Sequence, residues 1–198
     1  MELYELYRLI NLQTEMIQEL KVVSGQLNIN QFDLYLEMLM DRNTAAQAYR
    51  DLRALLAEDK DNIKMLYCQL ECARRILDKY QAKHISNAVY IDTMQCFTRF
   101  IEECKRKNGR MFFDRGWWTY RQVSMCIFRI AELEYEFNKY EGENVIVIHI
   151  PSDVNLTKEA VDHSLEQAGI FFQTYYKDYE YKGYTCDSWL LSPVLRSL

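Results

Sequence analysis

A histidine lies inside the most strongly β-branched stretch of the chain. Residues 145–151 have the sequence Val-Ile-Val-Ile-His-Ile-Pro, and His149 is the polar side chain within this run. Val and Ile pack well on a pleated surface and Pro cannot donate to a ladder, so the run predicts a central strand that ends at Pro151. By alternation, His149 shares a face with Val145 and Val147. An imidazole in this place is either a hydrogen-bonded core group or part of a catalytic site.

A thiol and a hydroxyl near the carboxyl end could act together with this imidazole. Residues 184–191 predict a third strand, in which Cys186 and Ser188 share one face with Tyr184. If this strand pairs beside residues 145–150, His149 would supply a base and Cys186 or Ser188 a nucleophile or hydrogen-bonding partner. The alternative is a polar network that satisfies a buried histidine.

Two adjacent tryptophans form the other notable group. Trp117 and Trp118 precede Arg121, and the three side chains could line a ligand groove. An aromatic pair at the start of a helix also fits a core or an interface. With Tyr184 and Trp189 of the third strand, the two tryptophans are our candidate substrate-binding residues.

The cysteines and glycines give little support for a bound metal or nucleotide. The chain has six cysteines, mostly in apolar helical segments. Cys68 and Cys72 lie one helical turn apart, but no second pair completes a set of four ligands, so we expect no metal site. Neither GxxxxGK[ST] nor GxGxxG occurs, and we expect no permanently bound cofactor. A redox or metal role for the cysteines is a third hypothesis, beside a catalytic function and a role in protein interaction.

The first two thirds of the chain predict helices that would hold these residues in place. Both prolines follow residue 150, and apolar residues recur at helical spacing before that point. The expected helices cover residues 2–23, 31–40, 45–57, 61–82, 86–107 and 114–129.

At about Ala131 the hydrophobic period changes from 3.6 to 2. Residues 131–140 predict a strand with Glu132, Glu134 and Glu136 on its solvent face, and the turn at 141–144 predicts an antiparallel hairpin with residues 145–150. A helix over 157–176 would cover one face of this sheet. We therefore expect an α+β protein with a helical domain over 1–130 and a small α/β domain over 131–198.

Composition limits the class of protein. The chain has 198 residues, 49% hydrophobic and 27% charged, which is ordinary for a globular protein. Its net charge of -5 and the absence of a basic stripe argue against a nucleic-acid partner. No apolar run approaches 18 residues and no signal peptide is visible, so we expect a cytoplasmic protein with no membrane partner. The 15 tyrosines indicate contact surfaces or grooves.

Several segments together carry a resemblance to a known family. They are Trp117-Trp118, residues 129–136, His149-Ile150-Pro151, Leu156-Thr157 and residues 186–191. This pattern resembles bacterial acyltransferase-domain proteins that have an all-helical N-terminal domain and a GNAT-like C-terminal domain. The resemblance implies a mixed sheet with a covering helix, and acyl transfer from a CoA thioester, as cosubstrate, to a small-molecule amine or similar acceptor. It makes His149, Cys186 and Ser188 the candidate catalytic residues.

The chain departs from this family in two respects. The pyrophosphate signature, Gln or Arg followed by x-x-Gly-x-Gly/Ala, has no match. Members of the family continue into further sheet beyond the position of Trp189, so we expect a truncated three-stranded sheet whose exposed edges a second copy could complete, giving a homodimer. The alternative function is therefore a non-catalytic module for protein interaction or self-association.

Overall fold

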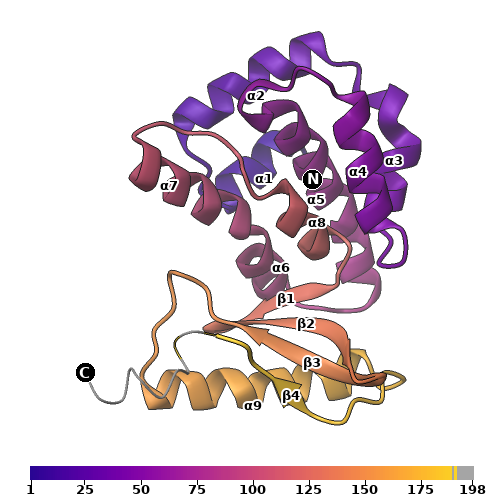
Figure 1. Cartoon of the computed structure of the whole chain (residues 1–198), viewed down its shortest axis with the longest axis vertical. Helices are drawn as coiled ribbons and strands as arrows, with labels where there is room; N and C mark the ends of the chain where they lie inside the picture. The colour runs from indigo at the N-terminus through magenta and orange to yellow at the C-terminus, as the bar shows by residue number, and fades with distance from the viewer. Residues whose placement is uncertain (189, 191–198) are drawn as a thin grey trace. The chain divides into compact units, whose positions relative to one another are not determined.

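The computed structural model describes residues 1–188 and residue 190. The chain divides into two compact units, Met1–Cys126 and Ile127–Leu198. The first is helical, and the second is a mixed sheet with a covering helix (Figure 1). These elements confirm the expected α+β class.

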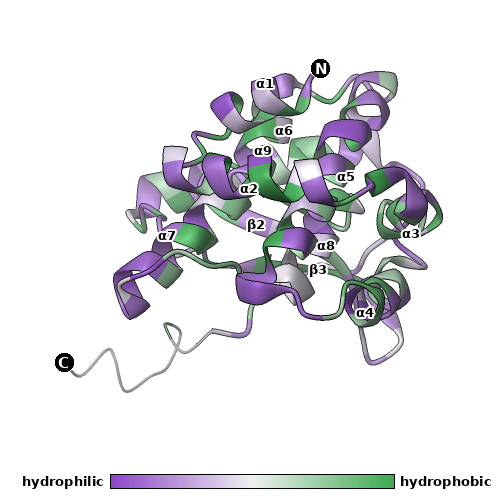
Figure 2. Ribbon diagram, turned by 90° about the horizontal axis from the view of Figure 1, so that it is seen from above, coloured by the Kyte–Doolittle hydropathy of each residue, from purple (hydrophilic) through white to green (hydrophobic). Residues whose placement is uncertain are grey.

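The long helix α5 (Ile63–Ala82) is the centre of the first unit. It packs against α1, α2, α3, α6 and α8, and most of its side chains are buried. Figure 2 shows hydrophobic and hydrophilic residues on the same helices, as expected where one side of each helix faces a core. The remaining helices of this unit, with two short 3₁₀ turns, are α1 (Leu3–Leu9), α2 (Thr14–Gln26), η1 (Ile29–Phe32), α3 (Asp33–Leu39), α4 (Ala45–Leu55), η2 (Lys60–Asn62), α6 (Asn87–Met94), α7 (Cys96–Asn108) and α8 (Gly116–Val123).

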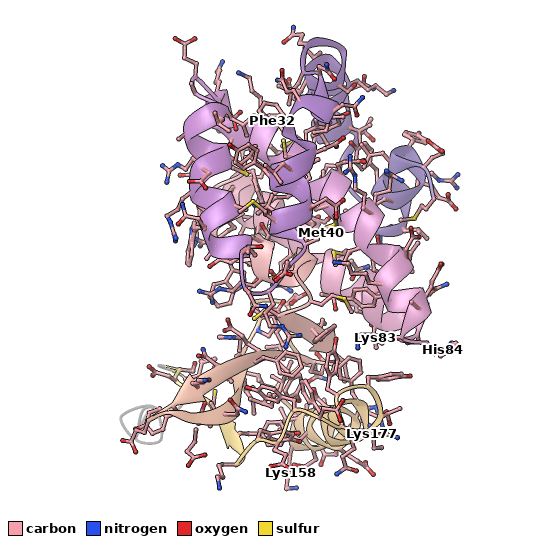
Figure 3. All side chains as sticks on the ribbon, turned by 90° about the vertical axis from the view of Figure 1, so that its right-hand side faces the viewer. Phe32, Met40, Lys83, His84, Lys158 and Lys177 are labelled. Atoms are coloured by element: carbon pink, nitrogen blue, oxygen red, sulfur yellow. The ribbon has the colours of Figure 1, made fainter. Side chains whose placement is uncertain are left out.

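Two of the predicted helices are interrupted. The segment 2–23 is divided between α1 and α2, because Asn11 adopts a left-handed conformation with φ of 55°. Asn is among the residues that tolerate this conformation best. The segment 86–107 is divided between α6 and α7, with Gln95 between them. Helix α3 follows the prediction for 31–40 more closely, and its flanking residues Phe32 and Met40 are both buried (Figure 3).

The predicted helix over 114–129 is wrong after Val123. Helix α8 ends at Val123, Met125 has a φ of 55°, and strand β1 (Ile127–Ile130) follows. The β1 sequence Ile-Phe-Arg-Ile is rich in residues that favour strands, and it belongs to the second unit. The sheet therefore has four strands among the described residues instead of the expected three.

The strands lie in the order β1-β2-β3-β4. Strands β2 (Leu133–Tyr140) and β3 (Glu143–His149) form the predicted antiparallel hairpin. Glu141 and Gly142 make its turn with φ of 51° and 85°, the pair of positive φ values typical of a tight hairpin. Strand β4 (Tyr184–Thr185) is parallel to β3. It is shorter than the predicted strand over 184–191, of which residues 189 and 191 lie outside the described residues.

Helix α9 (Lys158–Tyr175) covers one face of the sheet, as predicted for 157–176. The ring of Phe172 lies 6.3 Å from that of Tyr135 and 5.2 Å from that of Phe137. Figure 3 labels Lys158, the first residue of this helix, and Lys177, which lies two residues beyond its end.

A buried serine fixes α9 to the turn between β1 and β2. The Ser164 hydroxyl donates to the carbonyl of Ile130 at 2.6 Å and accepts from the backbone N–H of Leu133 at 3.2 Å. It also lies 2.9 Å from the Tyr135 hydroxyl. Because these groups are buried, the bonds hold the helix at one position along the sheet.

Candidate functional site

His149 forms a pair with a glutamate on the neighbouring strand. Its Nε2 lies 2.8 Å from Oε2 of Glu136. The two residues are not directly opposite each other, because His149 pairs with Glu134 and Glu136 pairs with Val147 in the ladder. The contact is therefore a diagonal one on a single face of the sheet, within the reach of long side chains.

This face is the one opposite α9. Alternation along β2 places Tyr135 and Phe137 under the helix and Glu134 and Glu136 on the other side. On β1, Arg129 is directly opposite Glu134 in the register, so Arg129, Glu134 and His149 form a row across three strands. When His149 is protonated, the charges in this row alternate in sign, so each side chain attracts its neighbours.

Arg129 is itself fixed by the loop after β3. Its Nη1 donates to Asp153 at 2.9 Å, and its Nε donates to the carbonyl of Ala131 at 2.7 Å. The expectation of a solvated glutamate face is wrong, because Glu134 and Glu136 are only 3% and 7% exposed. Glu134 lies opposite Arg129 and Glu136 contacts the His149 ring, so both buried carboxylates have polar partners.

A carboxylate on one ring nitrogen orients an imidazole for proton transfer. When Nε2–H donates to Glu136, the neutral ring carries its lone pair on Nδ1, and the carboxylate stabilises the imidazolium formed when Nδ1 takes a proton. The pair can therefore act as an oriented general base.

The structure places Cys186 and Ser188 just after β4. Within that strand, Thr185 pairs with Val147 and so lies on the His149 face, whereas Tyr184 lies on the α9 face. The strand ends there, so Cys186 and Ser188 do not follow its alternation, and their predicted approach to His149 stays a prediction. Burial, followed by the charge of Asp187, raises the pKa of the Cys186 thiol, which lowers its thiolate content. The Ser188 hydroxyl accepts from the backbone N–H of Leu190 at 3.3 Å.

The other aromatic candidates are divided between the two units. Tyr184 lies with its ring 6.1 Å from that of Tyr135 and its hydroxyl 3.2 Å from that of Tyr181, in the aromatic layer next to α9. Trp189 lies outside the described residues. Their proposed roles in substrate binding stay predictions.

Trp117 and Trp118 belong to α8 in the first unit. Their rings meet edge to face with centroids 5.7 Å apart, and the Arg121 guanidinium lies 4.4 Å from the Trp118 ring. Trp117 is 46% exposed and lines a cavity together with Arg53, while Trp118 and Arg121 are not part of that lining. Of the three residues predicted to line a groove, Trp117 is thus the one that lines this cavity.

The cysteines are packed as apolar side chains. All six are free thiols, and burial raises the pKa of Cys68 to about 12 and holds that of Cys72 well above its ordinary value. The described part of the chain holds no cluster of three or more His, Cys, Asp or Glu side chains placed to bind a metal ion. Within the same residues, none of the helices has the length and hydrophobicity needed to cross a bilayer.

Sequence reasoning missed Glu136 as the partner of His149. A signal was present, since Gly142 in a two-residue turn fixes the hairpin register with Tyr140 opposite Glu143. Counting back from this pair places Glu136 opposite Val147 and therefore beside His149. Arg129 was missed because the pattern around it predicts the end of a helix, whereas the residue lies in β1.

Comparison with protein families identifies the first unit. Residues 1–125 match the family of the N-acyltransferase N-terminal domain. The chain belongs to this family. The match covers nearly all of unit 1, so the helical unit is the part of this N-acyltransferase-family chain that defines its family. Comparison with curated proteins finds no match.

Solved structures share the fold over nearly the whole chain. An acyltransferase in complex with decanoyl-CoA and teicoplanin has a TM-score of 0.80 and 17% identity, covering 99% of this chain and 64% of that one. An acyltransferase with decanoyl-CoA has a TM-score of 0.74 and 18% identity, covering 98% and 64%. A third, with CoA and 10C-teicoplanin, has a TM-score of 0.66 and 14% identity, covering 100% and 76%. Our chain thus spans about 64% of the first two structures.

Proposed function

We propose that this chain forms part of an N-acyltransferase that moves an acyl group from a CoA thioester to an amine. The observation that carries the proposal is the His149–Glu136 pair, at 2.8 Å, in a chain of the N-acyltransferase family. The neighbouring structures with decanoyl-CoA and CoA support an acyl-CoA donor. The acceptor bound in one of them is teicoplanin, and an amine is the acceptor class that the family description supports.

The reaction requires one base and no covalent enzyme intermediate. The neutral amine attacks the thioester carbonyl, the C–N bond forms and the C–S bond breaks. His149 takes the proton that the nitrogen loses, and CoA leaves as a thiolate that is then protonated. Glu136 stabilises the positive charge that His149 acquires in this step. Cys186 and Ser188 are then candidates for contacts to the reacting groups, with no obligatory nucleophilic role.

Binding of the donor is the first test. The chain should bind decanoyl-CoA in a calorimetric titration, and saturation at 100 times the dissociation constant should raise its stability by roughly 2.7 kcal/mol. Free decanoate is the control, since it lacks the CoA moiety. Failure to bind any acyl-CoA would argue strongly against the proposal.

The second test addresses the base. With a panel of amines and decanoyl-CoA, release of CoA thiol should fall by roughly 10²-fold or more in His149→Gln, and less in Glu136→Gln, with donor affinity retained. Glu141→Gln in the exposed hairpin turn is the matched control and should keep full activity. Equal activity in wild type and His149→Gln would exclude His149 as the base.

The short β4 favours a second candidate function, self-association through the sheet. Among the described residues, β4 pairs with Ile146 and Val147 of the seven-residue β3, and backbone bonds of Gly183 and Lys182 extend this contact to Asn144. A strand from a second copy could extend such an edge, as in a homodimer. Sedimentation equilibrium should then give a dimer mass that acyl-CoA leaves unchanged, whereas a monomer over the whole concentration range would rule this out.

A further inference from the structure

The first unit contains a small cavity whose lining combines aromatic rings with charged groups. Its volume is about 150 Å³. An apolar cavity of this size holds a molecule such as benzene. The rings of Tyr49, Phe113 and Trp117 contribute the walls, from α4, from the segment before α8 and from α8 itself. All of the lining residues belong to unit 1, so the cavity is a property of the helical unit alone.

Carboxylates outnumber the cation in this lining. Asp59 and Asp114 carry one negative charge each and Arg53 one positive charge, which leaves a net charge of -1. Arg53 forms a hydrogen bond with the Tyr49 side chain. The cavity therefore favours a ligand with a positive charge.

Asp59 is held by two backbone hydrogen bonds, and the charge of Lys64 also favours its ionised form. Its two oxygens accept from the backbone N–H groups of Lys64 and Met65 at 2.8 and 2.9 Å. Partial burial raises the pKa of Asp59 despite these bonds and the attraction of Lys64, and the negative charge of Asp61 adds to the increase. A cation in the cavity would compensate this charge.

Asp114 is the second acid of the lining, and it is half-exposed. Its Oδ1 accepts from the Cys104 thiol at 3.2 Å, and its other oxygen lies 3.8 Å from the Arg115 guanidinium. The latter distance is at the outer limit of an ion pair, and the Asp114 side chain is 39% exposed. This carboxylate can therefore accept a hydrogen bond from an ammonium group.

A glycine at the cavity provides space that no other residue would leave. A Cβ at Gly116 would lie 3.1 Å from the Tyr49 ring, 3.2 Å from Cγ of Met65 and 3.4 Å from the Phe113 ring. The Gly116 carbonyl accepts from the buried Gln69 side chain at 2.9 Å, which fixes this part of the wall. The pocket is thus rigid where α8 begins.

The loop that presents Asp59 has an unusual backbone. Ala57 and Glu58 have φ of 21° and 30°, and Asp61 and Asn62 each have φ of 58°. Residues other than glycine rarely adopt such values, and they persist only where surrounding structure holds them, often at binding sites. The strain supports a role for this loop beyond connecting α4 to α5.

We propose that this cavity binds a small molecule that carries a protonated amine on a flat apolar body of about the size of a benzene ring. The ammonium group would meet Asp114 and Asp59, and the ring would pack between Trp117 and Tyr49. Aromatic faces also attract cations, which adds to the preference for an amine. The proposal concerns the helical unit and does not depend on acyl transfer.

Three probes of one shape test this proposal on the full chain. Benzylamine, benzyl alcohol and benzoate differ mainly in the charge of the group on the ring. Calorimetric titrations should give the highest affinity for benzylamine, with benzyl alcohol weaker by roughly tenfold or more, as expected for loss of a charge-assisted hydrogen bond. Preferred binding of benzoate, or equal binding of the amine and the alcohol, would overturn the proposal.

Variants locate the site. Asp114→Asn should weaken benzylamine binding by roughly tenfold and leave that of benzyl alcohol unchanged. Asp51→Asn, on the exposed side of α4, is the matched control and should change neither. If Asp114→Asn proves unstable, Trp117→Leu at the exposed wall should weaken both probes. Unchanged benzylamine binding in both Asp114→Asn and Trp117→Leu would place binding elsewhere and refute the proposal.

Discussion

The chemistry of His149 depends on one neighbour that alternation alone does not reveal. The β-branched run around this histidine identifies the strand and the face on which the imidazole lies. The partner Glu136 is set by cross-strand register, and the diagonal contact depends on where the turn at Glu141 and Gly142 falls. Sequence patterns predict the strand and the face of His149 but do not reveal Glu136, the group that its ring contacts.

The burial of the thiols predicts the order in which the cysteines react with an alkylating reagent. At pH 8, a pKa of about 12 gives Cys68 roughly a thousandfold less thiolate than an ordinary thiol. In the native protein, iodoacetamide should therefore modify half-buried Cys186 well before Cys68 and Cys72, as measured by peptide mass spectrometry. Labelling in denaturant is the control and should modify all six cysteines at similar rates. Fast native labelling of Cys68 would contradict its burial.

Among the elements, long amphipathic helices and the hairpin were predictable because each has a strong period over many residues. The predictions failed at the boundaries. Asn11 and Met125 adopt left-handed conformations that end helices without a glycine or proline to mark them. Strand β1 has only four residues, too few for a period of two to be distinguished from the end of a helix.

A charged network joins α3 to α5 and predicts a pH-dependent contribution of Glu71 to stability. Glu71 accepts hydrogen bonds from Arg74 at 2.6 and 2.8 Å and from Arg75 at 2.8 Å, and Arg75 also donates to Asp33 at 2.8 Å. Burial alone would raise the pKa of Glu71, but the two guanidinium groups hold it below its ordinary value of 4.5. The ionised carboxylate therefore stabilises the folded state above that pH, and this contribution is lost as the pH falls through the lowered pKa.

Glu71→Gln should reduce the free energy of unfolding by roughly 2 kcal/mol at neutral pH, because it removes charge-assisted hydrogen bonds. The deficit should narrow as the pH falls below about 4.5, where wild type loses the same contribution. Urea unfolding at a series of pH values measures both effects. Exposed Glu19→Gln is the control, and a deficit that is constant from neutral to acid pH would contradict the ionic explanation.

For the whole molecule, the change from a helical to a sheet period near residue 130 predicts an organisation in two parts. The observed division falls between Cys126 and Ile127, because β1 belongs to the sheet. The family match over residues 1–125 follows the same division. Overall architecture was thus easier to predict than side-chain contacts, since it depends on composition and period alone.

The first unit should fold without the second. Residues 1–126 have their own core around α5, and a fragment of this length should give a helical circular dichroism spectrum and a cooperative thermal transition. The full chain, measured under the same conditions, serves as the reference. A gradual, non-cooperative transition in the fragment would show that unit 1 requires the sheet for its stability.

The parallel pairing of β4 with β3 has a consequence for the order of folding. Strands β1, β2 and β3 are joined by tight turns and can associate quickly, since the loops to be closed are short. Strand β4 can join Ile146 and Val147 only after the chain has passed through α9. The sheet edge on the strand that carries His149 is therefore assembled last, and in hydrogen exchange its amides should be among the first of the sheet to open.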